Sequence, residues 1–254
     1  MMWRWKTRLL GFAAFVAVLL IWEAAYRMHL ISPIIFASPS LIWYATLSDG
    51  GIFLNALRIT AYEILIATVI AWSGGILLGI LAGTINLVGR IFAPFLSALI
   101  AIPFVILYPV LLAWLGIGPI SKIAFGIVLG LFPIALSTML GIQAIDKGFA
   151  TMAEAMGASR FQTIVRVMVP LALPAVISGL RLGTSLLIAG VVLTEMLAST
   201  DGLGFWITYN RWLFNTGQVY LGIIFVLSLA VASNVVLSLI ERRFGRWRSL
   251  QQET

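Results

Sequence analysis

Uncharged apolar runs dominate this sequence and limit what it can fold into. Residues 64–82, 91–121 and 123–145 contain no charged side chain. About 20 consecutive apolar residues are enough to cross the hydrocarbon core of a bilayer as a helix. Only helices and closed barrels satisfy their own backbone hydrogen bonds in hydrocarbon. Because the runs have helical length, we expect an all-α, polytopic membrane protein.

Composition agrees with this expectation and excludes other classes of protein. Of the 254 residues, 61% are hydrophobic and 10% are charged, far below the roughly 25% charged content of soluble domains. The net charge of +7 does not indicate nucleic-acid binding, because the basic residues lie at the two ends and in connecting segments rather than in one patch. The absence of cysteine excludes a disulfide framework, and no other set of ligands predicts a metal site.

About six transmembrane helices are predicted, in a single domain of residues 1–254 with its core at 56–240. The first apolar run resembles the hydrophobic part of a secretory signal, but Glu23 interrupts it and no clean cleavage site follows, so we expect a retained helix. The predicted spans are residues 9–26, 56–83, 91–121, 123–145, 170–196 and 219–240. The predicted outer connections are residues 27–55, the turn 116–122 and the aromatic-rich loop 205–214.

Small residues and prolines mark two of these spans. Gly75, Gly79 and Gly83 repeat every four residues, which predicts a face that another helix can approach closely. Three prolines bend or interrupt the next span, and the last two free carbonyls that need protein or water as partners at membrane depth, which suits the wall of a pathway. They are Pro94, Pro103 and Pro109.

Basic residues divide unevenly between the two sides of this topology. With six spans, both termini share one side. That side carries Arg4, Lys6, Arg8, Arg90, Lys147, Arg160, Arg166, Arg242, Arg243, Arg246 and Arg248, and the other carries Arg27, Lys122 and Arg211, with Arg58 near its mouth. By the positive-inside rule we expect both termini in the cytoplasm.

One polar segment, residues 146–170, interrupts the apolar runs. Asp146 is a plausible N-cap, and apolar residues then recur at helical spacing up to Gly157, which ends a short amphipathic helix. Ser159 and Gln162 form the two halves of a capping box that starts a second helix, ending at Pro170. The apolar ridge of the first helix suits docking to a partner. The alternative is a helix lying in the headgroup layer.

This segment resembles the cytoplasmic loop of permease subunits of bacterial ABC importers, whose pattern is Glu-Ala-Ala, three residues, Gly, nine residues, Ile, one residue, Leu-Pro. Aligned on Gly157, the pattern places Thr151, Met152 and Ala153 at its first three positions and Val167, Val169 and Pro170 at its last. The glutamate is missing. We hypothesise that Glu154, one helical turn after Thr151, replaces it.

Weaker likenesses extend the resemblance over about residues 56–240. They are the turn 116–122, the block 172–181, Glu195 and the segment 202–204. Outside that range, Ser38, Pro39 and Ser40 resemble a segment of the nitrate, sulfonate and taurine branch of these permeases.

The sequence carries no signature of chemistry of its own. It has no GxxxxGK[ST] loop for ATP, no HExxH helix and no nucleophile with a base. Glu63 and Glu195 lie near the outer ends of spans, and Lys122 lies in a predicted loop. Buried charges suited to proton coupling are therefore scarce, which favours a carrier driven from outside the chain.

The resemblance implies the membrane subunit of a type I ABC importer in the bacterial inner membrane, not itself an enzyme and without a cofactor of its own. ATP and Mg would bind to a dimeric cytoplasmic ATPase, a periplasmic binding protein would deliver substrate, and a second permease copy would complete the pathway. The implied coupling residues are Phe149, Thr151, Met152, Ala153, Glu154, Met156, Gly157 and Pro170. Our candidate pathway residues are Tyr62, Glu63, Tyr108, Ser137, Ser185, Thr194 and Glu195.

The branch resembled implies a small anion or zwitterion, such as a sulfonate, taurine or nitrate, as substrate. Relatives of this branch that import thiamine precursors, riboflavin or aromatic acids keep those substrates open. A secondary transporter or channel that works without an ATPase is the alternative from another class, and a membrane-bound enzyme is the more remote one.

Overall fold

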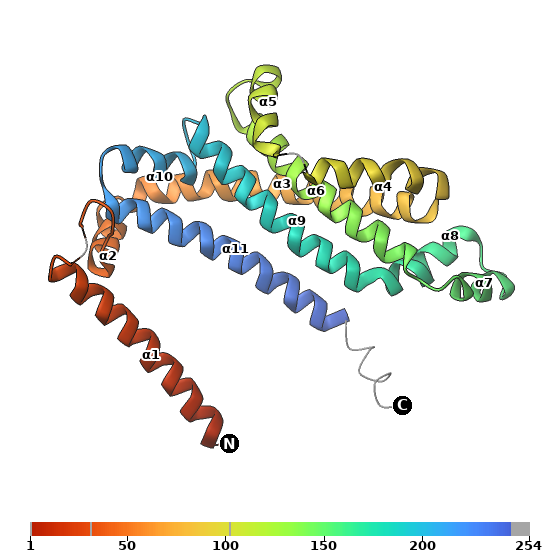
Figure 1. The fold of residues 1–254 in the computed structure, drawn as a ribbon, viewed down its shortest axis with the longest axis horizontal. Helices are drawn as coiled ribbons and strands as arrows, with labels where there is room; N and C mark the ends of the chain where they lie inside the picture. The colour runs from red at the N-terminus through yellow and green to blue at the C-terminus, as the bar shows by residue number, and fades with distance from the viewer. Residues whose placement is uncertain (1, 31, 102, 245–254) are drawn as a thin grey trace. The chain divides into compact units, whose positions relative to one another are not determined.

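The computed structural model describes residues 2–30, 32–101 and 103–244, and every regular element in them is helical (Figure 1). In chain order the elements are α1 (Met2–Arg27), α2 (Pro39–Ser48), α3 (Gly50–Thr84), α4 (Asn86–Ala101), the 3₁₀ turn η1 (Phe104–Ile106), α5 (Leu107–Leu115), α6 (Pro119–Gln143), α7 (Lys147–Ala155), α8 (Arg160–Thr163), the π-helical turn η2 (Ile164–Met168), α9 (Val169–Leu197), α10 (Leu203–Trp212) and α11 (Thr216–Phe244). The predicted fold class is confirmed.

Five helices of the described residues are long and apolar enough to cross a membrane. They are Leu10–Arg27, Gly50–Thr84, Pro119–Gln143, Arg160–Leu197 and Thr216–Leu239. The expected third span is instead divided into α4 and the shorter apolar helix Phe104–Leu115. Pro103 lies at this break, as predicted, whereas Pro94 lies inside α4 and Pro109 lies in the first turn of α5, where the missing N–H has no helical partner to lose.

Three predicted connections contain helix. The connector 27–55 holds α2 and the start of α3, the stretch 205–214 lies mostly in α10, and the turn 116–122 ends inside α6. Pro39 and Pro119, which lie in predicted connections, occupy the first turns of α2 and α6. Proline is favoured at that position because the first N–H groups of a helix are unpaired anyway. The prediction that Lys122 lies in a loop is therefore wrong.

The chain divides into two compact units. One comprises Met1–Ile59 and Asp201–Leu227. In it, the Glu23 carboxylate of α1 accepts hydrogen bonds from the Ser40 hydroxyl at 2.9 Å and from Arg27 at 2.7 Å. The Phe53 ring meets Trp206 edge-on, with centroids 5.1 Å apart. Aromatic contacts and polar bonds at the helix ends thus hold this unit together.

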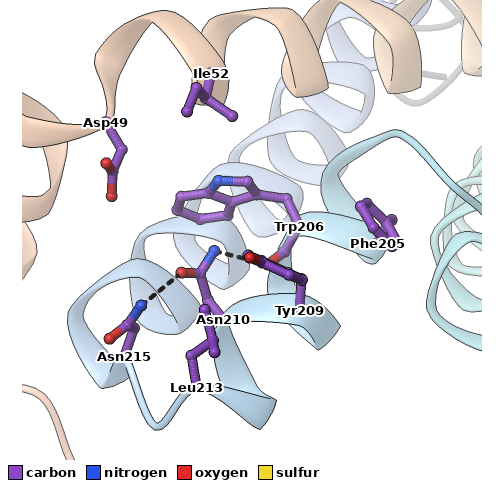
Figure 2. A pocket seen from close by; sticks show the side chains of 8 residues that line it. All are labelled: Asp49, Ile52, Phe205, Trp206, Tyr209, Asn210, Leu213 and Asn215. Atoms are coloured by element: carbon purple, nitrogen blue, oxygen red, sulfur yellow. Dashed lines mark hydrogen bonds between the residues drawn. The ribbon is translucent and has the colours of Figure 1, made fainter.

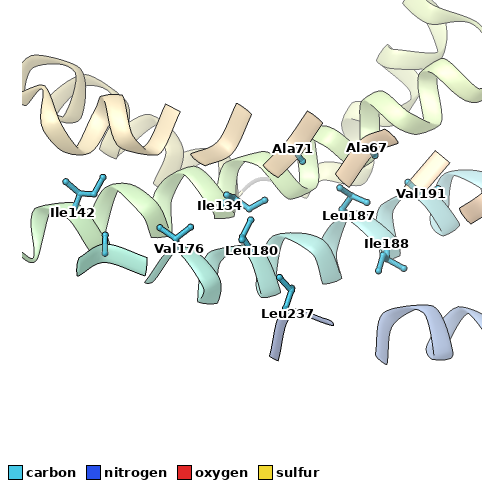
Figure 3. Packing of buried hydrophobic residues seen from close by; sticks show 11 residues of the cluster. Ala67, Ala71, Ile134, Ile142, Val176, Leu180, Leu187, Ile188, Val191 and Leu237 are labelled. Carbon is cyan, nitrogen blue, oxygen red and sulfur yellow. The ribbon is translucent and has the colours of Figure 1, made fainter. Parts of the chain in front are cut away.

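The second unit, Thr60–Thr200 with Ser228–Thr254, is built on the pairing of α6 with α9 (Figure 1). A Cβ added at Gly130 would touch the Gly183 carbonyl oxygen, and one added at Gly179 would lie 2.6 Å from the Ser137 Cβ. The partners run in opposite directions along the two helices, so α6 and α9 form an antiparallel hairpin whose backbones are in close contact. Figure 3 shows the apolar core around it, formed by Ala67, Ala71, Ile134, Ile142, Ala172, Val176, Leu180, Leu187, Ile188, Val191 and Leu237.

The glycine face of α3 packs against α6, as predicted. Cβ atoms added at Gly75, Gly79 and Gly83 would lie less than 3.0 Å from Ile134, Thr138 and Ile142 respectively. No Cβ tolerates such a distance, so only glycine lets α3 approach α6 this closely. The partner numbers rise together, so α3 runs parallel to α6.

Candidate functional site

The polar segment forms the short amphipathic helix expected, α7. The Asp146 carboxylate accepts a hydrogen bond of 2.8 Å from the Gly148 N–H and so caps the helix. The apolar side chains of Phe149, Met152 and Met156 are 50%, 67% and 88% exposed. Within the described part of the chain, the two methionine side chains of the ridge are therefore mostly exposed and Phe149 is half exposed.

Gly157 ends the helix in a Schellman motif. Its φ of 86° lies in the left-handed region that favours glycine. The Gly157 N–H donates to the Glu154 carbonyl at 2.9 Å, and the Ala158 N–H donates to the Ala153 carbonyl at 3.0 Å. These two bonds satisfy carbonyls that the helix end leaves open. The corner is thus fixed by backbone geometry.

The capping box that follows is also confirmed. The Ser159 N–H donates to the Gln162 side chain at 2.8 Å, and the Gln162 N–H donates to the Ser159 hydroxyl at 3.3 Å. The second helix does not end at Pro170, however, because the chain stays helical from Arg160 to Leu197.

A wide helical turn accommodates Pro170. Residues Ile164–Met168 form a π-helical turn, in which the Val169 N–H donates to the Ile164 carbonyl. An ordinary α-helical turn would leave the proline ring against the carbonyl four residues earlier. The extra residue in the turn relieves this clash, and such turns frequently occur at functional sites.

The base of α7 contacts the hairpin. Phe149 lines a pocket of about 380 Å³ together with the end of α6 and the start of α9, including Gly141, Leu171 and Pro174. In chain order α7 follows α6 and leads through α8 into α9, so both of its ends connect to helices of the same hairpin. Thr151 and Glu154 are exposed one turn apart, and the Thr151 hydroxyl donates to the Lys147 carbonyl at 3.2 Å.

The predicted pathway residues fall into two groups. Tyr62 is exposed, and Ser137 and Ser185 are half-buried, with the Ser185 hydroxyl bonded to the Arg181 carbonyl. The other group is buried in the second unit and consists of Glu63, Tyr108, Thr194 and Glu195. The Tyr108 hydroxyl donates to the carbonyls of Thr194 at 3.3 Å and Ala198 at 3.1 Å.

Lys122, which the sequence did not indicate as a site residue, lies among this buried group. The side chains of Lys122 and Glu63 are each 1% exposed, and Lys122 Nζ lies 2.6 Å from Glu63 Oε1. Lys122 also donates to the Ser199 hydroxyl at 3.2 Å, and the Thr60 hydroxyl donates to Glu195 at 2.7 Å. We call Glu63, Lys122 and Glu195 the buried charge cluster.

A repeat in the sequence could have revealed the cluster. Glu63 heads a series in which every fourth residue is small, so it lies on the face that carries Gly75, Gly79 and Gly83. A carboxylate on a face that packs against another helix needs a buried partner. Lys122, in the first turn after Pro119, is the basic residue at the matching end of α6.

A separate hollow lies in the first unit (Figure 2). It encloses about 300 Å³ and is lined by Asp49, Ile52, Phe205, Trp206, Tyr209, Asn210, Leu213 and Asn215. The Asn215 amide donates to the Asn210 side chain at 3.1 Å, and the Asn210 amide donates to the Trp206 carbonyl at 2.9 Å. The two asparagines are thus already hydrogen-bonded, and the Asp49 carboxylate accepts a hydrogen bond of 2.9 Å from the Gln218 amide. Across the described residues, no group of His, Cys, Asp and Glu could hold a metal ion.

Comparisons with known proteins agree with this architecture. Residues 75–246 match the family of binding-protein-dependent transport system inner membrane components. The taurine transport system permease protein TauC of Escherichia coli is 29% identical over 96% of this chain and 93% of its own length. The riboflavin transport system permease protein RibX of Chloroflexus aurantiacus is 29% identical over 97% and 93%.

A solved structure shares the fold. A chain of the inward-facing MetNI methionine ABC transporter is 18% identical, covers 82% of this chain and 99% of its own, and superposes with a TM-score of 0.67. At this identity the likeness concerns the fold. Because the family match covers most of the chain, the protein belongs to the binding-protein-dependent transport system inner membrane components, the non-catalytic permease subunits of ABC importers.

Proposed function

We propose that α7 is the element through which a cytoplasmic ATPase drives this permease. The observation that carries the proposal is the exposed ridge of Phe149, Met152 and Met156 on a helix outside the long apolar spans. Methionine side chains adapt well to a groove in a partner. Exposed apolar side chains on a fixed helix are typical of a docking surface.

The two ends of α7 explain how movement would pass into the membrane. Its start follows α6 after Ala144–Asp146, and its end leads through the Gly157 corner and α8 into α9. Since α6 and α9 pack backbone to backbone, a force on α7 would move both helices together. Transport requires that the ATPase make different contacts in its two states, and a rigid hairpin can transmit that difference.

The remaining assembly follows from this role. Both termini and α7 face the cytoplasm of a bacterium, in accordance with the predicted distribution of basic residues. Of the residues on which that orientation depends, Arg246 and Arg248 lie outside the described part of the chain. Two permease copies and an ATPase dimer form the transporter, and a periplasmic binding protein delivers the substrate.

The substrate we propose is a small anion or zwitterion. The taurine permease of E. coli supports this class, because it is 29% identical over nearly the whole chain. The riboflavin permease is equally similar and supports a vitamin as the second candidate. Uptake of radiolabelled taurine, nitrate and riboflavin into vesicles containing the complete transporter with its binding protein separates the two.

Co-purification with the ATPase tests the docking role. Replacing Met152 and Met156 by Asp places two carboxylates on the ridge, and we expect capture of the ATPase and ATP-dependent uptake to fall at least about tenfold. Met28→Asp is the matched control, because Met28 is equally exposed but lies after α1. Wild-type capture and uptake by the α7 variant would refute the proposal.

A further inference from the structure

Three helices of the second unit contribute one ionisable side chain each to the buried charge cluster. Glu63 belongs to α3, Lys122 to α6 and Glu195 to α9. All three are about 1% exposed. Moving ions out of water costs several kcal/mol each, and apolar residues of similar volume often pack as stably. Helix packing alone does not account for charges here.

The cluster lies at the end of a repeat that runs along all three helices. On α3, Glu63 is followed at every fourth position by Ala67, Ala71, Gly75, Gly79 and Gly83. On α6, Lys122 is followed in the same way by Gly126, Gly130, Ile134, Thr138 and Ile142. Leading up to Glu195, α9 carries Ala175, Gly179, Gly183, Leu187 and Val191.

Such repeats bring the helices together but leave their axial position weakly defined. If α3 moved one turn along α6, Gly79 would face Ile134 in place of Thr138, and Gly83 would face Thr138 in place of Ile142. A glycine would still lie opposite a branched side chain at both places. Small-residue faces therefore permit more than one register, one helical turn or about 5.4 Å apart.

The charges distinguish these registers. In the structure Glu63 faces Lys122 at 2.6 Å, in step with the contacts of Gly75, Gly79 and Gly83 further along. The same displacement would place Ala67 opposite Lys122 and carry the Glu63 carboxylate to the level of Gly118, so the buried ammonium group would lose its partner. A charge separated from its partner among apolar helices is strongly unfavourable. A single buried polar group is known to fix register in this way in paired helices.

We propose that Lys122 is a positioning residue that locks α3 and α9 to one register against α6. Its ammonium contacts α3 through Glu63 and the segment after α9 through Ser199. The lock lies at the end of the α6–α9 hairpin opposite α7. It therefore fixes the position of α7 relative to α3 along the helix axes. The inference about the register rests on contacts within this chain, whereas its consequence for ATP coupling rests on the proposed function.

Engineered cysteines report the register directly, because the natural chain contains none. A Cβ added at Gly126 would lie 3.4 Å from the Ala67 Cβ, close to the separation in a disulfide. Ala67→Cys with Gly126→Cys therefore reports the observed register. Ala71→Cys with Gly126→Cys reports the register displaced by one turn. Val191→Ala, present in both, makes room for the new side chain at position 126.

The full-length transporter is then compared with charges and without them. In the charged chain we expect the first pair to cross-link and the second not to. In a neutral variant, with Lys122→Met, Glu63→Leu and Glu195→Leu, we expect cross-linking of the second pair to rise about tenfold, the change in equilibrium that one interhelical polar interaction of ordinary strength controls. Substrate imported per ATP hydrolysed should fall, while capture of the ATPase stays unchanged.

Other outcomes contradict the lock. Equal cross-linking of the displaced pair with and without the charges would overturn the lock. So would a neutral variant in which the displaced pair does not cross-link. If the neutral variant does not accumulate, Glu63→Lys alone and Glu63→Lys with Lys122→Glu take its place. The single change should lose the observed register and the exchanged pair should recover it, and failure of that recovery would equally overturn the lock. If the chain that keeps all three charges fails to capture the ATPase, that result would count against the proposed function and not against the lock.

Discussion

The polar segment around α7 and the buried charge cluster are both polar regions of an apolar chain, yet they differ in the range and the burial of their contacts. Asp146, Ser159 and Gln162 bond to backbone groups within three residues of themselves and are exposed. Glu63 and Lys122 bond to each other across helices and are excluded from solvent. Polar residues grouped in sequence thus stabilise helix ends, whereas isolated charges in apolar runs determine how helices align.

The largest expected effect comes from removing the ammonium group of the cluster. Lys122→Met leaves the buried Glu63 carboxylate without the ammonium group 2.6 Å away, and breaking a buried ion pair costs roughly 3–5 kcal/mol. We expect the midpoint of thermal unfolding in detergent to fall steeply. Lys147→Met in exposed α7 is the control and should leave the midpoint unchanged. A similar midpoint for both variants would show that the two regions do not differ in this way.

The next effect concerns the glycine face of α3 that packs against α6. A Cβ at Gly79 would press on Thr138 and the Ala135 carbonyl, whereas one at Gly74 would meet only the end of the Leu131 side chain at 3.2 Å. Gly79→Ala should therefore destabilise the protein by about 1–3 kcal/mol through overpacking. Gly74→Ala, on the same helix, should cost less than about 1 kcal/mol. Equal unfolding midpoints would contradict the close approach of α3 to α6.

A smaller effect is expected at the corner after α7. A Cβ at Gly157 meets open space, so the cost of Gly157→Ala comes only from its left-handed backbone, about 1–2 kcal/mol. Because the strain is local, we expect weaker ATPase binding, measured by titration, with little change in unfolding midpoint. Gly51→Ala, which also meets open space but lies in ordinary helix, is the control. An unchanged affinity for the ATPase would show that the Gly157 corner is not needed for docking.

The smallest effect should follow loss of an exposed ion pair. Arg181 lies 2.8 Å from Glu241, and both side chains are nearly half exposed. Exposed pairs contribute about 0–1 kcal/mol, so Arg181→Gln should shift the unfolding midpoint little. A loss as large as that of Lys122→Met would show that exposure does not explain the contrast between the two regions.

Local features of the chain were predictable from sequence. The N-cap at Asp146, the glycine corner and the Ser159–Gln162 capping box depend on residues close in sequence, and each lies where the pattern indicated. The close approach at Gly75, Gly79 and Gly83 was predictable because spacing alone defines a helix face. Proline was the weaker guide, since Pro39 and Pro119 lie in the first turns of helices and the chain stays helical through Pro170.

By itself, the sequence determined that this protein is a helical membrane protein with an exposed amphipathic helix between two spans, because apolar length and local capping fix those features. Only the tertiary structure decided that Lys122 is buried against Glu63 and that the helix continues through Pro170 by a widened turn. The position of a charge depends on residues far away in the chain, and the free energy of pairing it inside the protein appears only when the helices are packed together.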